Sequence, residues 1–154
     1  MIPGPEVCRL TPEDLPLILE LERLTSPDPW SLESFLGEME RSFTVPLGIM
    51  AAGSLAGFLL AWLLPPETHL LKLAVSPPWE GRGLGTRLLS FLIELTRQAG
   101  GSRILLEVRH TNQRALRLYR RAGFAIDGRA IGYYGQGIDA LRMSLDLRDP
   151  AAGI

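Results

Sequence analysis

A glycine-rich turn between an apolar segment and a long helical segment could bind a phosphate group. The turn is Gly81-Arg82-Gly83-Leu84-Gly85-Thr86, and Arg87 follows it. The start of a helix leaves backbone N–H groups unpaired and carries a partial positive charge, and glycine lets a ligand approach the backbone closely. A tight strand-to-helix turn without any ligand would also need glycines. The alternation with arginine favours the phosphate-binding interpretation.

The spacing of these glycines does not match the two common nucleotide-binding motifs. A P-loop needs a lysine followed by serine or threonine directly after its last glycine, and Lys72, the only lysine of the chain, precedes the turn. A dinucleotide fingerprint, Gly-x-Gly-x-x-Gly, needs a third glycine where this chain has Thr86 or, counted from Gly83, Leu88. A phosphate ligand at this turn would therefore belong to another class.

Two further residues could transfer protons. Glu107 interrupts the apolar segment Arg103–Arg109, and alternation along a strand places it on the same face as Leu105. This pattern fits a functional carboxylate and an edge strand with a solvated or salt-bridged glutamate equally well. Tyr119 falls on the inward stripe of a helix over residues 113–122, where a core tyrosine with a satisfied hydroxyl is the commoner outcome.

The elements that must position these residues follow from hydrophobic periodicity and turn signals. Helices are predicted after the caps Thr11, Ser31 and Asn112, and from Leu84 to Ala99. Strands are predicted over Phe43–Met50, Leu55–Leu64, His69–Val75, Arg103–Arg109, 124–133 and 139–147, with Tyr133–Gly137 as the loop between the last two. The first two strands form an antiparallel hairpin, and a later crossover is parallel. This order predicts a mixed α/β sheet in a single domain over residues 1–154.

The cysteine count and the hydrophobic segments indicate in which cellular compartment the protein works. Cys8 is the only cysteine, so no internal disulfide can form and a reducing compartment is the simplest interpretation. The first residues lack the basic start and apolar core of a signal peptide. The apolar run Leu55–Leu64 is far shorter than the ~20 residues that span a bilayer. We therefore expect a cytoplasmic protein without a membrane segment.

The net charge of −1 conceals an uneven distribution. Residues 1–40 carry nine acids and two arginines, a net −7, whereas residues 41–154 carry fourteen bases and eight acids, a net +6. A basic C-terminal part suits a polyanionic ligand because arginine forms forked hydrogen bonds to phosphate. A solvated charged surface would show the same composition.

Taken together, these motifs resemble the GNAT superfamily of N-acetyltransferases. The residues that carry the resemblance are, in order, the strand Leu70–Val75, the glycine-rich turn, the long helix, Leu106-Glu107-Val108-Arg109, Asn112, Leu118-Tyr119 and Ala122-Gly123-Phe124. Within the superfamily, Pro29-Trp30-Ser31 and the Tyr133-Tyr134 pair are similar to the RimI-type ribosomal-protein-alanine N-acetyltransferases. The resemblance covers nearly the whole chain and is strongest from residue 69 to residue 124.

The resemblance implies a sheet that is mostly antiparallel, splayed between two central parallel strands and flanked by about four helices. It also implies direct transfer of an acetyl group from acetyl-coenzyme A (acetyl-CoA) to an amine. Glu107 matches the general base of the family and Tyr119 its general acid. The implied cofactor-binding residues are Leu73, Ala74 and Val75 for the acetyl and pantetheine part, Gly81, Arg82, Gly83, Leu84, Gly85 and Thr86 for the pyrophosphate, and Asn112 and Tyr119. Trp30, Tyr133 and Tyr134 would form walls for the acceptor.

One residue departs from the family pattern. The turn usually begins with glutamine or arginine three residues before its central glycine, and this chain has Glu80 there. A carboxylate beside a pyrophosphate is unfavourable, so we expect Glu80 to face solvent and Arg82 or Arg87 to supply positive charge.

Three functions remain compatible with the sequence. The first is acetylation of a protein N-terminal α-amine, in a basic ribosomal protein that the acidic N-terminal region would attract. The second is acetylation of a small-molecule amine or of a protein lysine with the same cofactor. The third is a binding module that uses the arginines at 109, 114, 117, 120 and 121. The expectation is the first, with a monomer or weak homodimer, no metal, and no direct binding of nucleic acid or membrane.

Overall fold

The computed structural model describes residues 6–153 and shows the expected α/β architecture. Four α-helices accompany a seven-stranded sheet in these residues, with the strand order β1-β2-β3-β4-β5-β7-β6. Strands β4 and β5 pair in parallel, and the pairs β1–β2, β2–β3, β5–β7 and β6–β7 are antiparallel. The chain divides into two compact units, one ending at Trp62 and resuming over Lys72–Phe91, the other made of Leu63–Leu71 and the residues from Leu92 onward.

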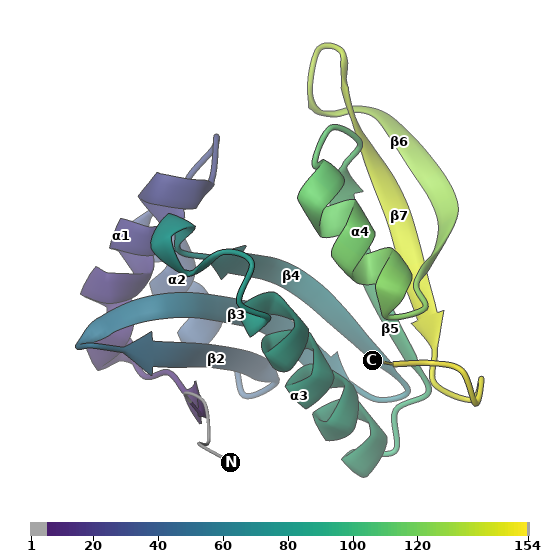
Figure 1. Cartoon of the computed structure of the whole chain (residues 1–154), viewed down its shortest axis with the longest axis horizontal. Coiled ribbons are helices and arrows are strands. Elements are labelled where there is room, and N and C mark those ends of the chain that lie inside the picture. The colour runs from purple at the N-terminus through teal and green to yellow at the C-terminus, as the bar shows by residue number, and fades with distance from the viewer. Residues whose placement is uncertain (1–5, 154) are drawn as a thin grey trace. The chain divides into compact units, whose positions relative to one another are not determined.

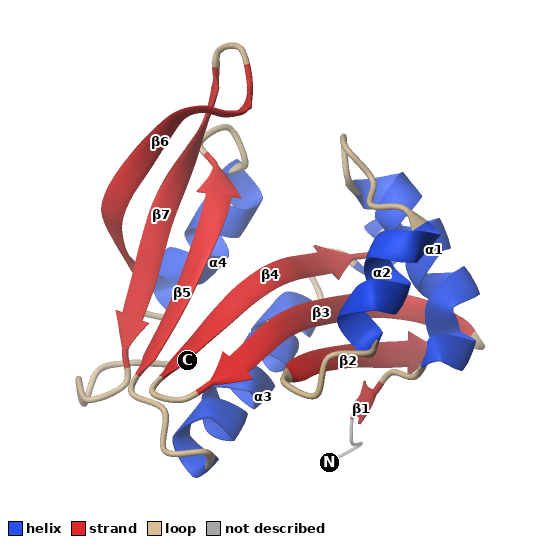
Figure 2. Ribbon diagram, turned by 180° about the vertical axis from the view of Figure 1, so that it is seen from behind, coloured by secondary structure: helices blue, strands red, loops and turns tan. Residues whose placement is uncertain are grey.

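In the first unit, helices cover both faces of the β2–β3 hairpin (Figures 1 and 2). Strands β2 (Thr44–Ala51) and β3 (Ser54–Leu64) pair around Gly53, as predicted. Helices α1 (Leu15–Thr25) and α2 (Leu32–Met39) lie on one face, and the start of α3 (Leu84–Gln98) lies on the other. The Phe35 ring of α2 meets the Phe58 ring of β3 at a centroid distance of 6.1 Å.

The predicted caps are present at the helix starts. The Ser34 N–H donates to the Ser31 side chain over 3.2 Å at the start of α2. At Thr11, the backbone N–H donates to the Asp14 carboxylate over 2.8 Å, but a short 3-10 turn, Pro12–Asp14, precedes α1. A three-residue edge strand, β1 (Val7–Arg9), pairs with β2 and was not predicted from the sequence. Such a short strand has too few residues to show an alternating pattern.

A buried ion pair joins α1 to the end of β4 (Glu67–Val75). Glu22 is 2% exposed, and its carboxylate lies 2.6 Å from the Lys72 ammonium. The same carboxylate accepts the backbone N–H of Trp30 over 2.9 Å, and the Lys72 ammonium lies 4.4 Å from the centre of the Trp30 ring. A buried charge is costly unless it is paired and hydrogen-bonded, so these three residues depend on one another.

Lys72→Met is expected to lower the free energy of unfolding by about 3–5 kcal/mol, because it leaves the buried Glu22 carboxylate without its cationic partner. Urea denaturation of the purified protein measures this change. Arg148→Met is the matched control: it also removes one side of an ion pair, with Asp146 at 2.9 Å, but that pair is exposed and its loss should change almost nothing. Equal stability of the Lys72→Met variant and the wild type would contradict the prediction.

In the second unit, α4 (Gln113–Arg121) lies on one face of β5 (Arg103–Arg109) and β7 (Ile138–Asp146), as Figures 1 and 2 show. The side chains of β5 alternate as predicted: Ile104, Leu106 and Val108 are buried, and the residues between them are half-buried. The alternative that β5 is an edge strand is wrong, because it pairs with β4 on one side and β7 on the other.

The parallel pairing of β4 with β5 runs from Glu67 opposite Arg103 to Leu70 opposite Leu106. Both strands continue beyond these residues, to Val75 and Arg109 respectively. The splay between them, which the family resemblance implies, stays a prediction.

The predicted loop Tyr133–Gly137 is wrong. Strand β6 (Ala125–Gly135) contains both tyrosines, and only Gln136 and Gly137 separate it from β7. The pairing is irregular there: Ala130 faces Ala140 and Gly135 faces Ile138, so β6 bulges between them. Asp139 holds this bulge by accepting the Gly132 N–H over 2.9 Å and the Arg129 guanidinium over 2.7 Å, and these two hydrogen bonds hold the pKa of Asp139 below its usual range.

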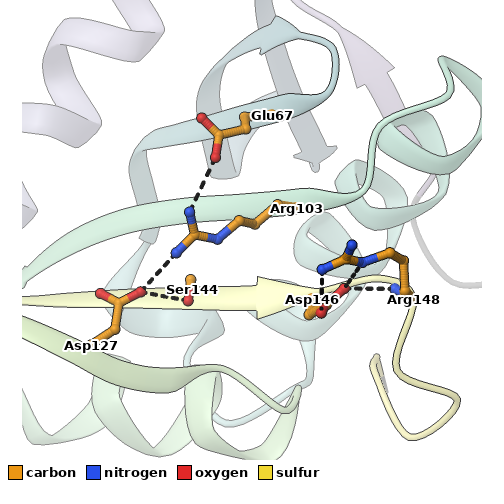
Figure 3. A network of polar contacts seen from close by, with 6 residues as sticks. All are labelled: Glu67, Arg103, Asp127, Ser144, Asp146 and Arg148. Atoms are coloured by element: carbon orange, nitrogen blue, oxygen red, sulfur yellow. Dashed lines mark hydrogen bonds and ion pairs between the residues drawn. The ribbon is translucent and has the colours of Figure 1, made fainter.

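The face of this sheet opposite α4 carries a row of charged side chains (Figure 3). Arg103 donates to Glu67 over 3.1 Å and to Asp127 over 3.0 Å, and Asp127 also accepts the Ser144 hydroxyl. A separate pair, Asp146 and Arg148, follows near the end of β7, where the Arg148 hydrogen bonds lower the pKa of Asp146 to about 2. No helix within residues 6–153 has the length and apolar character needed to cross a membrane.

Candidate active site

The glycine-rich turn is open, as a phosphate site requires. Gly81 and Gly83 have φ angles of +75° and +80°, which side chains other than glycine rarely adopt. A Cβ atom placed on either glycine would meet no other atom within 4 Å. The helix α3 begins at Leu84, and its first turn is closed by the Arg87 N–H donating to the Gly83 carbonyl over 3.0 Å. The turn therefore does not pack against protein atoms at these glycines.

The charged residues around the turn are placed as expected. Glu80 is an exposed residue. Arg82 is also exposed, and its guanidinium carbon lies 4.9 Å from the centre of the Trp79 ring. This cation–π contact restricts the arginine beside the turn. Trp79 was not among the predicted site residues, because its contact with Arg82 depends on the folded conformation of the turn.

Gly83→Ala is expected to weaken acetyl-CoA binding roughly tenfold, because a side chain strains the left-handed backbone and occupies the space beside the exposed N–H groups. Isothermal titration calorimetry measures the dissociation constant. Gly53→Ala is the matched control, since Gly53 has a φ of +77° and equally open surroundings in the β2–β3 turn. Equal affinities for both variants and the wild type would contradict the role of the turn.

Strand β3 holds the end of β4, which contains Leu73, Ala74 and Val75. The Ser76 N–H donates to the Ala56 carbonyl over 2.8 Å. A Cβ atom on Gly57 would lie only 3.2 Å from the Ala74 carbonyl oxygen and 3.3 Å from Leu88 of α3. Glycine at position 57 therefore allows strand and helix to approach closely at the segment assigned to the acetyl and pantetheine part.

Glu107 lies on the central strand β5 with its carboxylate partly accessible. Its side chain is 26% exposed, and its Oε2 atom lies 2.6 Å from Nε2 of His69 on β4. Arg142 of β7 stands directly opposite it in the antiparallel register. This contact was not predicted from the sequence, because 37 residues lie between His69 and Glu107 and the parallel pairing of their strands brings them together.

Tyr119 is buried on the inward face of α4. It is 6% exposed, and its ring centre lies 5.6 Å from that of Phe124. Burial, with a smaller contribution from Tyr134, raises the pKa of the Tyr119 phenol well above its ordinary value of 10. The phenol therefore keeps its proton throughout the neutral range, as a general acid must.

This raised pKa predicts a loss of stability in alkali. A group with a raised pKa stabilises the fold fully below its ordinary value and loses that contribution as the pH rises above it. The melting temperature of the wild type should therefore fall more between pH 9 and pH 11 than that of Tyr119→Phe, which retains the ring and lacks the ionisable hydroxyl. Thermal unfolding followed by circular dichroism measures both, and parallel pH dependences would contradict the prediction.

The other predicted residues have mixed surroundings. Asn112 caps α4 by accepting the Ala115 N–H over 3.2 Å, so its amide group can still donate to a ligand. Tyr134 is half-buried with the Arg109 guanidinium 4.3 Å from its ring centre, and Tyr133 is 58% exposed. Burial, Tyr133 and Glu107 raise the pKa of Tyr134. Trp30, in the other unit, is half-buried against Phe35 and borders an open hollow of about 350 Å³.

Residues 7–124 match the model of the acetyltransferase (GNAT) family. The chain belongs to this family. It is therefore an N-acetyltransferase, and enzymes of the GNAT family take the acetyl group from acetyl-CoA. Within residues 6–153 no group of three or more histidine, cysteine or acidic side chains could hold a metal ion.

Individual GNAT relatives confirm the RimI-type resemblance. The chain is 35% identical over 138 residues to the N-alpha-acetyltransferase RimI of Mycobacterium tuberculosis, and the alignment covers 86% of this chain and 85% of that protein. It is 33% identical over 115 residues to the [ribosomal protein bS18]-alanine N-acetyltransferase of Salmonella typhimurium, covering 75% and 77%. The crystal structure of the ribosomal-protein-S18-alanine N-acetyltransferase from Escherichia coli superposes with a TM-score of 0.86 at 28% identity, over 94% of both chains.

Proposed function

We propose that this enzyme acetylates the N-terminal α-amine of a ribosomal protein, with a homologue of bS18 as the first candidate. The choice of acceptor is supported by the similarity, over most of both chains, to proteins named for acetylation of the bS18 alanine. Ribosomal proteins and acetyl-CoA meet in the cytoplasm, where we place the reaction. A monomer suffices for it.

The charge of the first unit supports a cationic acceptor. Of the nine acids in residues 1–40, Glu22 and Glu38 are buried and engaged with Lys72 and with Trp62. Six others, Glu6, Glu13, Glu20, Asp28, Glu33 and Glu40, are exposed. An excess of exposed carboxylates attracts a basic protein segment over distances of about a Debye length, ~8 Å at physiological salt.

In the proposed reaction, Glu107 removes a proton from the acceptor ammonium. An α-amine has a pKa near 7.7–8.0, against about 10.4 for lysine, so a carboxylate base acting directly or through one water suffices for an α-amine. The neutral amine attacks the thioester carbonyl, and a backbone N–H near Val75 would stabilise the resulting oxyanion. As the carbon–sulfur bond breaks, Tyr119 gives its proton to the leaving thiolate, and the second proton of the attacking nitrogen passes through solvent to the Tyr119 phenolate. The amides of residues 81–86 hold the pyrophosphate, with Asn112 on the pantetheine arm.

The test is a thiol-release assay with acetyl-CoA and a set of acceptors. The set contains a peptide of the first residues of bS18, the same peptide with its α-amine blocked and a lysine added, and a free polyamine. Turnover of the unblocked peptide alone supports the proposal. Preference for the blocked peptide would assign the enzyme to lysine, and preference for the polyamine to small-molecule amines.

A further inference from the structure

The contact between His69 and Glu107 follows from the register of two parallel strands. His69 faces Leu105 in the pairing of β4 with β5, and Glu107 is the next residue along β5 on the same face. Their neighbours Thr68 and Leu70, on the other face of β4, are buried, and Thr68 exchanges a hydrogen bond with Thr96 of α3. The helix-covered face thus anchors the strand, and the opposite face presents the imidazole to the carboxylate.

Stability gives little reason for this contact. The side chains of His69 and Glu107 are 31% and 26% exposed, and neither belongs to the buried core. Partly exposed ion pairs and polar pairs contribute little to folding, typically about 0–1 kcal/mol. A short hydrogen bond of 2.6 Å that adds little stability can instead serve to orient the carboxylate.

The charged residues around Glu107 make its strength as a base depend on the direction in which its carboxylate points. Arg142 stands opposite it on β7, Arg109 follows it on the same face of β5, and Tyr134 of β6 is close enough for Glu107 to raise its pKa. A glutamate has three rotatable bonds, so the carboxylate could turn toward either arginine. A carboxylate paired with a guanidinium is a weaker base, because the positive charge favours its ionised form.

We propose that His69 is a positioning residue that holds the Glu107 carboxylate in the orientation in which it accepts a proton from the acceptor amine. The imidazole donates its Nε2–H to Oε2 of Glu107, and Oε1 takes the proton from the acceptor ammonium. The proton moves from the amine nitrogen to Oε1, while the imidazole keeps its own proton. This inference rests on the proposed role of Glu107 as the base.

The test measures acetyl transfer to the bS18 peptide by the wild type, by four variants and by one control variant. His69→Leu removes the donor, whereas His69→Gln keeps an amide N–H at a similar distance from the backbone. We expect His69→Leu to lower kcat about tenfold to a hundredfold, the effect of losing one hydrogen bond to a charged group, with the dissociation constant of acetyl-CoA unchanged. His69→Gln should retain kcat within about threefold.

The other two variants ask whether His69 acts through Glu107. Glu107→Gln should be impaired, and adding His69→Leu to it should change kcat no further, because residues that act as one unit are not additive. Glu67→Gln controls for a polar change on the same face of β4. Urea denaturation and the acetyl-CoA affinity show that each variant is folded.

Each outcome decides for or against the inference. A wild-type kcat for His69→Leu, with Glu107→Gln impaired, would overturn it and leave the proposed base in place. The inference would also be overturned if His69→Leu lowered kcat by the same factor in the wild type and in Glu107→Gln, because His69 would then act independently of Glu107. A wild-type kcat for Glu107→Gln would overturn both the base assignment and the role of His69.

Discussion

Glu107→Gln is expected to lower acetyl transfer to an α-amine by about ten- to ten-thousandfold, the range of general base catalysis. The amide has nearly the shape of the carboxylate but cannot accept the proton of the ammonium. Glu107 lies on the strand β5, which pairs on both sides, so the substitution should leave the fold intact. The affinity for acetyl-CoA should change little, because the side chain is assigned to the amine and not to the cofactor.

The pH dependence of this loss is the sharper measurement. Between pH 6 and pH 8 the neutral fraction of an α-amine rises from about 1–2% to about one half or more. A base matters most when the amine is protonated, so the ratio of wild-type to Glu107→Gln rates should be largest at pH 6 and should shrink toward pH 8. A constant ratio across this range, or a wild-type rate at pH 6, would argue against Glu107 as the base.

Local signals in the sequence were sufficient for most elements of the fold. The capping side chains Ser31 and Asn112, the alternation along Arg103–Arg109 and the glycines at 81 and 83 each act within a few residues. Their effect on the backbone does not depend on distant partners. The open glycine-rich turn before α3 could be predicted for the same reason, because its glycines and the helix start are adjacent in the chain.

Features that depend on distant residues were missed or misread. Gly135 and Gly137 both permit a turn, so the sequence alone could not show that β6 extends through Tyr133 and Tyr134 as a bulge held by Asp139. The contact of His69 with Glu107 requires the register of two strands separated by a whole helix.

The same limit affected the charge analysis. Counting residues 1–40 as a net −7 treated Glu22 as a surface charge, whereas Lys72 neutralises it in the interior. A carboxylate inside a helix gives no local sign of burial when its partner lies 50 residues away on a strand. The attraction for a cationic acceptor therefore rests on the acids that remain exposed.

Tyr119→Phe is expected to lower turnover by about ten- to ten-thousandfold through a different step. The phenol, with its raised pKa, stays protonated and can donate to the sulfur as negative charge develops on the leaving thiolate. Phenylalanine keeps the ring beside Phe124, at 5.6 Å between centres, so packing and the affinity for acetyl-CoA should change little. The change appears in kcat and kcat/KM together, because the donated proton is needed only in the transition state.

The two catalytic variants should differ in their response to pH. In the proposed reaction Tyr119 acts after the amine has attacked. Its loss should therefore cost the same factor at pH 6 and at pH 8, although the neutral fraction of the amine differs strongly between them. The loss in Glu107→Gln should shrink over the same interval. If Tyr119→Phe instead follows the pH dependence of Glu107→Gln, the tyrosine acts on the amine, and the leaving thiolate must obtain its proton from another donor, such as solvent or the amine itself.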